Sequence, residues 1–142
     1  MIYMFWLILG FVCGGMLLLY ARAYSKRAEK QVLAIALVIA AMIYVGFAIM
    51  WGDVTWLVIE LAGLPIYGIF AWRAIRYSQY YLLGIGWMLH PLWDVVLHLM
   101  GPGNIIAPEW YAIGCISFDL LVAGYIFSRV SSWQQVEALS LD

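Results

Sequence analysis

Five apolar stretches occupy most of the chain, and each is close to the roughly 20 residues that a helix needs to cross a bilayer. They cover residues 2–22, 31–51, 55–73, 80–100 and 109–129. Soluble domains carry about 25% charged residues. Here only 11% of the residues are charged and 67% are hydrophobic. We therefore predict an all-α integral membrane protein, in which residues 1–142 form a single domain of five transmembrane helices.

The basic residues predict the orientation of this bundle. All of them fall in the first and third connections or at the start of the C-terminal tail: Arg22, Lys26, Arg27, Lys30, Arg73, Arg76 and Arg129. The second and fourth connections contain none. Short cytoplasmic loops carry the excess of Lys and Arg. We therefore expect a multi-pass protein of the cell membrane, with its N-terminus outside the cell and its C-terminus in the cytoplasm.

Ionisable side chains lie inside three of the apolar stretches. The fourth contains His90, Asp94 and His98 at intervals of four residues, which places them on one stripe of a helix. Glu60 lies in the third stretch and Asp119 in the fifth. Counting about 1.5 Å per residue from the outer ends puts Glu60 level with Asp94, and Asp119 level with His90. We expect the three helices to share one polar cavity that opens toward the outer side.

Charge balance limits what this cavity can be, because ionisable groups are costly in hydrocarbon and usually mark functional sites. No basic residue accompanies Glu60, Asp94 and Asp119. Either protons neutralise these acids, or one or two divalent cations do. The candidate metal ligands form two sets: His90, Asp94 and Asp119, and Asp94, His98 and Glu60. Imidazole and carboxylate ligands suit zinc, iron or manganese, and Asp94 would bridge two ions if both sets were filled.

These residues leave three functions open. The first is a metal-dependent enzyme that acts on a lipid or isoprenoid, with Asp94, Glu60 and Asp119 as catalytic carboxylates. The second is a proton or cation relay or transporter, although the inner half offers few ionisable residues for it. The third is a non-catalytic subunit that binds a quinone, pigment or haem against Trp87 and Trp93.

The expected partners follow from the same composition. The lipid bilayer is one, and a lipophilic small molecule is another. No extended basic surface is present for the phosphates of a nucleic acid. Gly10-x-x-x-Gly14 is a spacing that lets membrane helices approach closely, so it allows a homodimer or a larger membrane complex.

Residues 86–125 also carry a recognisable pattern. It consists of Leu89-His90, Trp93-Asp94, His98, Pro108-Glu109-Trp110-Tyr111 and Phe118-Asp119. The pattern resembles a family of small bacterial five-span integral membrane proteins that is classed only as uncharacterised. The resemblance implies that these residues belong to a family pattern and that the membrane is a bacterial inner membrane, and it implies no activity.

Overall fold

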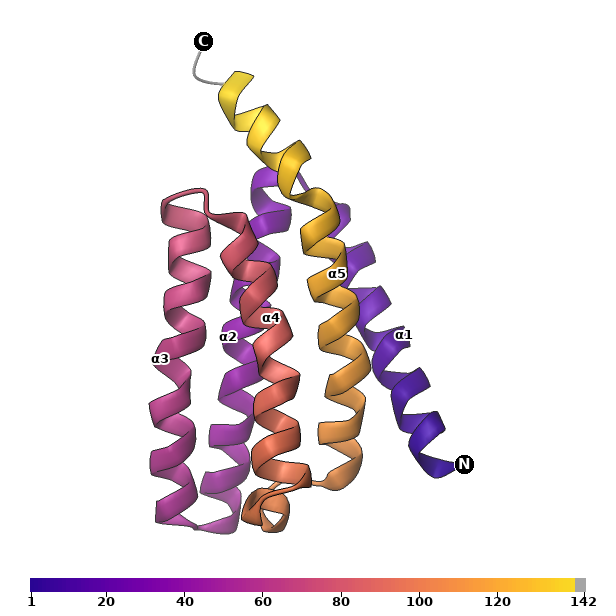
Figure 1. Ribbon diagram of the computed structural model, residues 1–142, viewed down its shortest axis with the longest axis vertical. Helices are drawn as coiled ribbons and strands as arrows, with labels where there is room; N and C mark the ends of the chain where they lie inside the picture. Colours follow the sequence, from indigo (N-terminus) through magenta and orange to yellow (C-terminus); the bar gives the residue numbers. More distant parts are fainter. Residues whose placement is uncertain (140–142) are drawn as a thin grey trace.

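The computed structural model describes residues 1–139 as a bundle of five long helices (Figure 1). They are α1 (Ile2–Arg22), α2 (Lys26–Trp51), α3 (Val54–Arg76), α4 (Tyr80–Asp94) and α5 (Glu109–Leu139). All five are long and apolar enough to span a membrane, α4 together with the residues up to Leu99. This confirms the predicted all-α membrane fold. Residues 140–142 of the predicted domain lie outside the described residues.

Two short elements follow α4 before the chain turns into α5. Val95–Leu99 is a π-helix, and Pro102–Ile105 is a 3₁₀-helix. The wider turn of the π-helix is closed by the Met100 N–H, which donates to the Val95 carbonyl five residues earlier at 2.8 Å. This element changes the direction in which His98 points relative to Asp94.

Two helices are longer than their apolar stretches predict. α2 begins at Lys26 instead of residue 31, and α5 continues to Leu139 instead of residue 129. The side chain of Ser25 caps α2 by accepting a hydrogen bond from the Ala28 N–H at 3.4 Å. Glu29 and Lys30, which the sequence placed in a loop, therefore belong to a helix and are buried.

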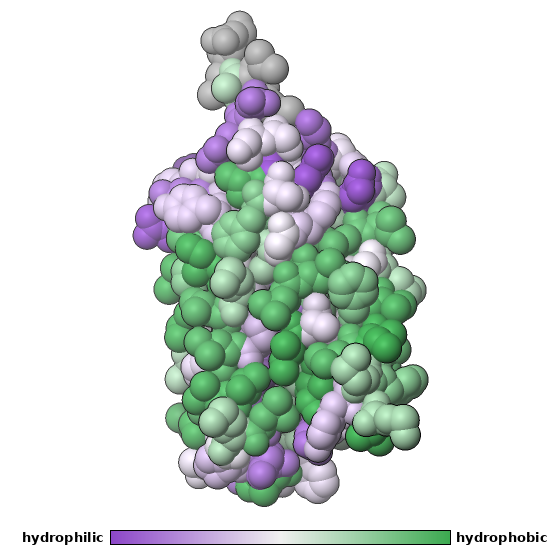
Figure 2. Space-filling view, turned by 45° about the vertical axis from the view of Figure 1, so that its right-hand side comes forward, coloured by the Kyte–Doolittle hydropathy of each residue, from purple (hydrophilic) through white to green (hydrophobic). Residues whose placement is uncertain are grey.

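The connections alternate between the two ends of the bundle. The α1–α2 and α3–α4 connections lie at the same end as the C-terminal part of α5, and the N-terminus lies at the opposite end (Figure 1). The end with the first two connections carries the basic residues, and we call it the basic end. Figure 2 shows a hydrophobic belt around the middle of the molecule with hydrophilic residues gathered above it. The predicted orientation in a membrane stays a prediction.

α1 packs along α5 through the glycines that the sequence suggested for dimerisation. A Cβ atom on Gly10 would lie 2.0 Å from the Gly114 carbonyl oxygen, so the two backbones meet at a distance that only glycine permits. Gly14 is also buried against α5. Ser117 on α5 donates to the Leu7 carbonyl on α1 at 2.6 Å. The small-residue motif thus serves contacts within the chain, and the homodimer is an untested prediction.

Candidate metal centre

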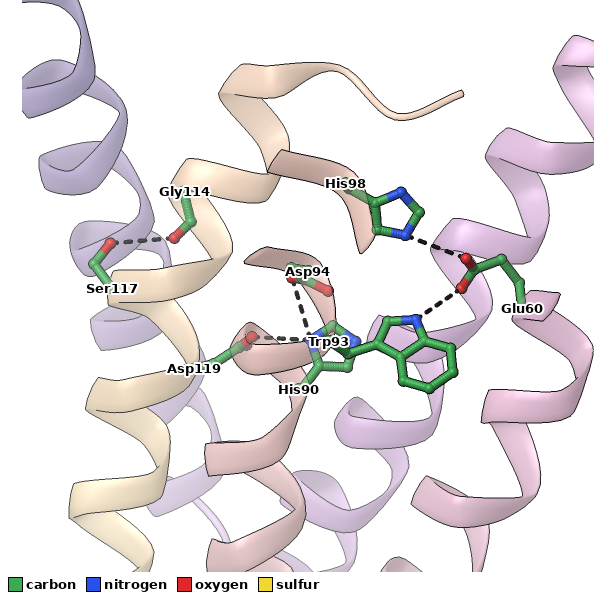
Figure 3. A network of polar contacts seen from close by, with 8 residues as sticks. All are labelled: Glu60, His90, Trp93, Asp94, His98, Gly114, Ser117 and Asp119. Atoms are coloured by element: carbon green, nitrogen blue, oxygen red, sulfur yellow. Dashed lines mark hydrogen bonds and ion pairs between the residues drawn. The ribbon is translucent and has the colours of Figure 1, made fainter. Parts of the chain in front are cut away.

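His90, Asp94 and Asp119 form a buried group at mid-depth of the bundle (Figure 3). α4 contributes His90 and Asp94 from successive turns, and α5 contributes Asp119 from the facing side. The His90 Nδ1 atom lies 2.9 Å from Asp119 Oδ2 and 3.5 Å from Asp94 Oδ2. One ligand atom from each residue lies within 4.8 Å of the other two. The structure therefore brings together the first of the two predicted ligand sets.

The polar atoms of this group are incompletely paired. Asp94 is fully buried, and neither of its carboxylate oxygens has a hydrogen-bond partner. His90 Nε2 and Asp119 Oδ1 are also buried without a partner. Buried polar atoms are normally hydrogen-bonded, and buried charges are normally paired or bound to metal. The donor set fits a divalent cation, because it supplies one imidazole and two carboxylates around a common point.

His98 and Glu60 form a second pair, closer to the end opposite the basic end. The His98 Nδ1 atom lies 3.2 Å from the Gly103 carbonyl oxygen, which can only accept, so this nitrogen carries a hydrogen. His98 Nε2 lies 3.2 Å from Glu60 Oε1. These two atoms are in contact, but neither has a partner in hydrogen-bond geometry. The other Glu60 oxygen accepts a hydrogen bond from Trp93 Nε1 at 3.2 Å (Figure 3).

The second predicted ligand set is not assembled as the sequence suggested. Glu60 and His98 meet, but Asp94 stays with His90 and Asp119, which is the only three-ligand group among the residues that the structure describes. A π-helix at Val95–Leu99 follows Asp94, and its wider turn gives His98 an angular position that differs from the one in a regular α-helix. Asp94 is therefore not positioned as a bridge between two metal ions.

The two tryptophans proposed for cofactor binding both use their indole N–H groups inside the protein. Trp87 is fully buried and donates to the Leu33 carbonyl at 3.1 Å. Trp93 is half-buried and donates to Glu60. Their stacking on a planar cofactor stays a prediction. Trp93 has a visible role of its own, since it fixes the carboxylate of Glu60.

Two tyrosines enclose the site. The ring of Tyr44 stacks on His98 with a centroid distance of 4.3 Å and an interplanar angle of 16°, and it lies 6.0 Å from the ring of His90. Its hydroxyl is buried without a hydrogen-bond partner. Tyr67 places its ring edge-on to His90 at 5.1 Å. Sequence reasoning missed Tyr44, although a tyrosine at mid-depth of the second apolar stretch was a signal for it.

Comparison with known proteins places the chain in a family. The model of the family of unknown function DUF6010 matches residues 5–132. The chain belongs to this family. The match covers most of every one of the five helices and every residue of the metal centre, and it confirms the predicted resemblance to an uncharacterised membrane-protein family. No curated protein and no solved structure matches the chain.

An apolar groove leads to the metal centre. It has a volume of about 350 Å³, α1 and α2 form its walls, and α5 and Trp87 complete its lining. It begins beside Trp6 and Trp110 at the end opposite the basic end and reaches Asp119. Asp119 is the one acid in a lining that consists mainly of small, aliphatic and aromatic residues. A hydrocarbon chain in this groove would therefore end next to a ligand of the candidate metal ion. Opening of the polar cavity to the outer side stays a prediction.

A separate buried polar cluster lies at the basic end. The Glu29 carboxylate accepts hydrogen bonds from the Tyr125 hydroxyl and from Trp133 Nε1, and Arg129 Nη2 lies 4.0 Å away. Lys30 donates to the Tyr80 hydroxyl at 2.5 Å. The contacts of Glu29 tie the C-terminal part of α5 to α2, and the contact of Lys30 ties α2 to the start of α4. The sequence prediction missed them because it began the second span at residue 31.

Proposed function

We propose that this protein binds one divalent metal ion inside the membrane, at His90, Asp94 and Asp119, and uses it to act on a lipid or isoprenoid. One observation carries the proposal. The Asp94 carboxylate is fully buried, neither of its oxygens has a hydrogen-bond partner, and its contact with His90 is 3.5 Å long, while the Asp119 carboxylate converges on the same point. Leaving a charged group unpaired in the protein interior costs several kcal/mol. A cation between the three side chains would offset this cost and explain why they converge.

The donor set favours zinc, iron or manganese, since it contains no thiolate and only one imidazole. Three protein ligands leave further coordination positions free, as in catalytic sites. Such an ion would activate a water molecule or polarise an oxygen of the substrate. His90, Asp94 and Asp119 hold the ion in this scheme, and the fixed backbone of α4 and α5 sets their spacing.

The groove supports a substrate with a long apolar part. Its walls come from α1 and α2, and its lining is almost wholly apolar until it reaches Asp119. A lipid or isoprenoid would place its chain against these walls and its polar, reacting group at the metal centre. Burial of the chain would supply binding free energy in proportion to the apolar area covered.

Glu60 suits the role of proton acceptor or donor. It lies outside the three-ligand group, and Trp93 and His98 fix its two oxygens. The contact between Glu60 and His98 joins a carboxylate and an imidazole, both of which can accept or donate a proton. The ring of Tyr44 contacts both His98 and His90, so it lies between the Glu60–His98 pair and the metal centre. We assign Glu60 to proton transfer and not to metal binding.

A relay across the membrane is the weaker alternative. Between the metal centre and the cluster around Glu29, α2, α4 and α5 each contribute two fully buried apolar side chains: Leu33, Leu37, Leu83, Trp87, Val122 and Ile126. None of these side chains can pass a proton along a chain of hydrogen bonds, apart from the Trp87 N–H that is already bonded to Leu33. A layer of apolar side chains therefore separates the metal centre from the cluster around Glu29.

A non-catalytic subunit that binds a quinone is the second candidate. The observation that favours it is the groove itself, because an apolar channel of about 350 Å³ would also suit the isoprenoid tail of a quinone. A measurement of metal binding distinguishes the two candidates, because the enzyme requires the metal ion and the quinone-binding subunit does not.

Thermal unfolding with added metal tests the proposed site. Chelator-treated protein in detergent would be titrated with zinc, manganese or ferrous iron, the last without oxygen. A ligand at 100 times its dissociation constant stabilises a protein by about 2.7 kcal/mol. We expect this gain for the wild type and for His98→Gln, but not for His90→Gln. Equal gains in both variants, or none in the wild type, would reject the site.

Lipid analysis tests the catalytic part. Membranes from cells that produce the wild type or Asp94→Asn would be compared by untargeted mass spectrometry. We expect a lipid or isoprenoid to be depleted and a product to accumulate with the wild type alone. Identical lipids, combined with intact metal binding, would leave the metal site standing and reject turnover of a membrane lipid.

A further inference from the structure

We propose a binding site for one anionic phospholipid on the surface formed by α2 and α3, independent of the metal centre. A second groove of about 760 Å³ runs between these helices on the side away from α5. Arg27 on α2 and Arg76 on α3 both line it, and its remaining lining residues are uncharged. The site combines a cationic end with an apolar trough, which is the chemistry of an anionic headgroup joined to an acyl chain.

Small residues make the trough. Ala34 and Ala71 lie buried along its floor, and a Cβ atom on Gly68 would meet no heavy atom within 4 Å. Larger side chains stand at its edges and are exposed, among them Ile39 and Trp72. The space over Gly68 is thus open to the hydrocarbon of the bilayer, and a lipid chain can occupy it.

The two arginines supply the charge. Arg27 lies in the first turn of α2 and Arg76 in the last turn of α3, so both lie at the basic end. Both are exposed, and neither forms an ion pair with a carboxylate of the described residues. Guanidinium groups bind phosphate through paired N–H donors. Two of them at the end of one groove favour a phosphate with a net negative headgroup over a zwitterionic lipid.

The length of the groove fits one leaflet. At about 1.5 Å per residue, Arg27 and Met42 are about 22 Å apart along α2. The hydrocarbon core of a bilayer is about 30 Å thick, so one leaflet contributes about 15 Å. The groove therefore reaches from the headgroup level to about the middle of the bilayer. Trp72 lies near the arginines, where an interfacial tryptophan is favoured.

Native mass spectrometry tests the charge of the headgroup. Detergent-purified protein would be mixed with dioleoyl phosphatidylglycerol or dioleoyl phosphatidylcholine at equal concentrations. We expect the wild type to retain phosphatidylglycerol preferentially, and the double variant Arg27→Gln, Arg76→Gln to lose about tenfold or more in that affinity. Arg73→Gln is the control, because Arg73 is exposed on the same helix, bonds to Gln79 and does not line the groove. Equal retention of both lipids by the wild type, or a loss in Arg73→Gln as large as that in the double variant, would overturn the site.

A second pair of variants tests the trough without changing charge. Gly68→Leu would fill the space over the floor, whereas Gly46→Leu adds the same side chain to α2 at a position that is also open and outside the groove. We expect Gly68→Leu to weaken phosphatidylglycerol retention and Gly46→Leu to leave it unchanged. If neither substitution lowers retention, the acyl chain does not lie in the groove and the proposal fails.

Discussion

His90 Nδ1 lies 2.9 Å from Asp119 Oδ2 and thereby joins the middle of α4 to the middle of α5. The contact fixes both the position and the tautomer of the imidazole, since a carboxylate beside Nδ1 favours a hydrogen on that nitrogen. If Nδ1 binds a metal ion, the hydrogen of a neutral imidazole moves to Nε2, which is buried without a partner. A net proton is released only where the imidazole or one of the two carboxylates holds an additional one.

Metal uptake should become tighter as the pH rises. Metal ligands bind in their deprotonated forms, so the ion displaces any proton that the His90 imidazole or the two carboxylates hold, and we expect an affinity that increases with pH. Isothermal titration calorimetry of zinc binding in two buffers with different ionisation enthalpies measures the number of protons released. A proton count of zero together with a pH-independent affinity would mean that the ion does not compete with protons for this group.

Removing the charge of Asp94 should stabilise the protein when metal is absent. A buried carboxylate without a hydrogen-bond partner and beside a second acid costs free energy, so Asp94→Asn should raise the free energy of unfolding of the metal-free protein by about 1–3 kcal/mol. Thermal unfolding in detergent with excess chelator measures it. In saturating metal the order should reverse, because only the wild type gains stability from the ion. A less stable metal-free variant would indicate that Asp94 has a structural partner, contrary to our account.

Much of this arrangement follows from spacing and depth in the sequence. His90 and Asp94 are one turn apart, so a regular helix places them on the same face. Asp119 reaches the same level because it lies as far into its apolar stretch as His90 lies into the fourth. The length and hydrophobicity of the five stretches were enough to predict five helical spans, because a chain inside a bilayer must satisfy its backbone hydrogen bonds as helices or as a closed barrel.

The remaining features depend on departures from regular helix geometry. The π-helix at Val95–Leu99 turns His98 toward Glu60, and a count of about 100° per residue cannot reveal an inserted wider turn. The sequence did not predict the cluster around Glu29, because hydrophobicity indicates where a membrane span ends and not where the helix itself ends. The pairing of Gly10 with Gly114 depends on which helix lies beside α1, and a glycine motif does not specify its partner.

Close contact between α1 and α5 makes Gly10 sensitive to any added atom. Gly10→Ala would force a Cβ atom to within 2.0 Å of the Gly114 carbonyl oxygen, so the helices must separate. We expect a loss of about 1–3 kcal/mol in the free energy of unfolding, as for other overpacked contacts. Gly15→Ala is the control, because a Cβ atom there meets nothing within 4 Å. Reversible unfolding in mixed micelles compares the two, and equal stability of both variants would contradict the packing.

The distribution of basic residues predicts which loops face the cytoplasm. We would introduce Ala23→Cys at the basic end or Asn104→Cys at the opposite end, in a background where Cys13 and Cys115 are replaced by alanine. A membrane-impermeant maleimide applied to sealed cells should label Asn104→Cys and leave Ala23→Cys unlabelled until the membrane is opened. The reverse labelling pattern would show that the basic end faces outward.

The metal content of the purified protein tests the central claim most directly. Protein prepared without chelators would be analysed by plasma mass spectrometry as the wild type, Asp94→Asn and Asp53→Asn. Asp53 caps α3 through the Trp56 N–H at 3.0 Å and lies outside the metal centre, and asparagine keeps this cap. Our account predicts about one equivalent of zinc, iron or manganese in the wild type and in Asp53→Asn, and at least a tenfold loss in Asp94→Asn. A wild type without transition metal, or an equal content in all three proteins, would contradict it.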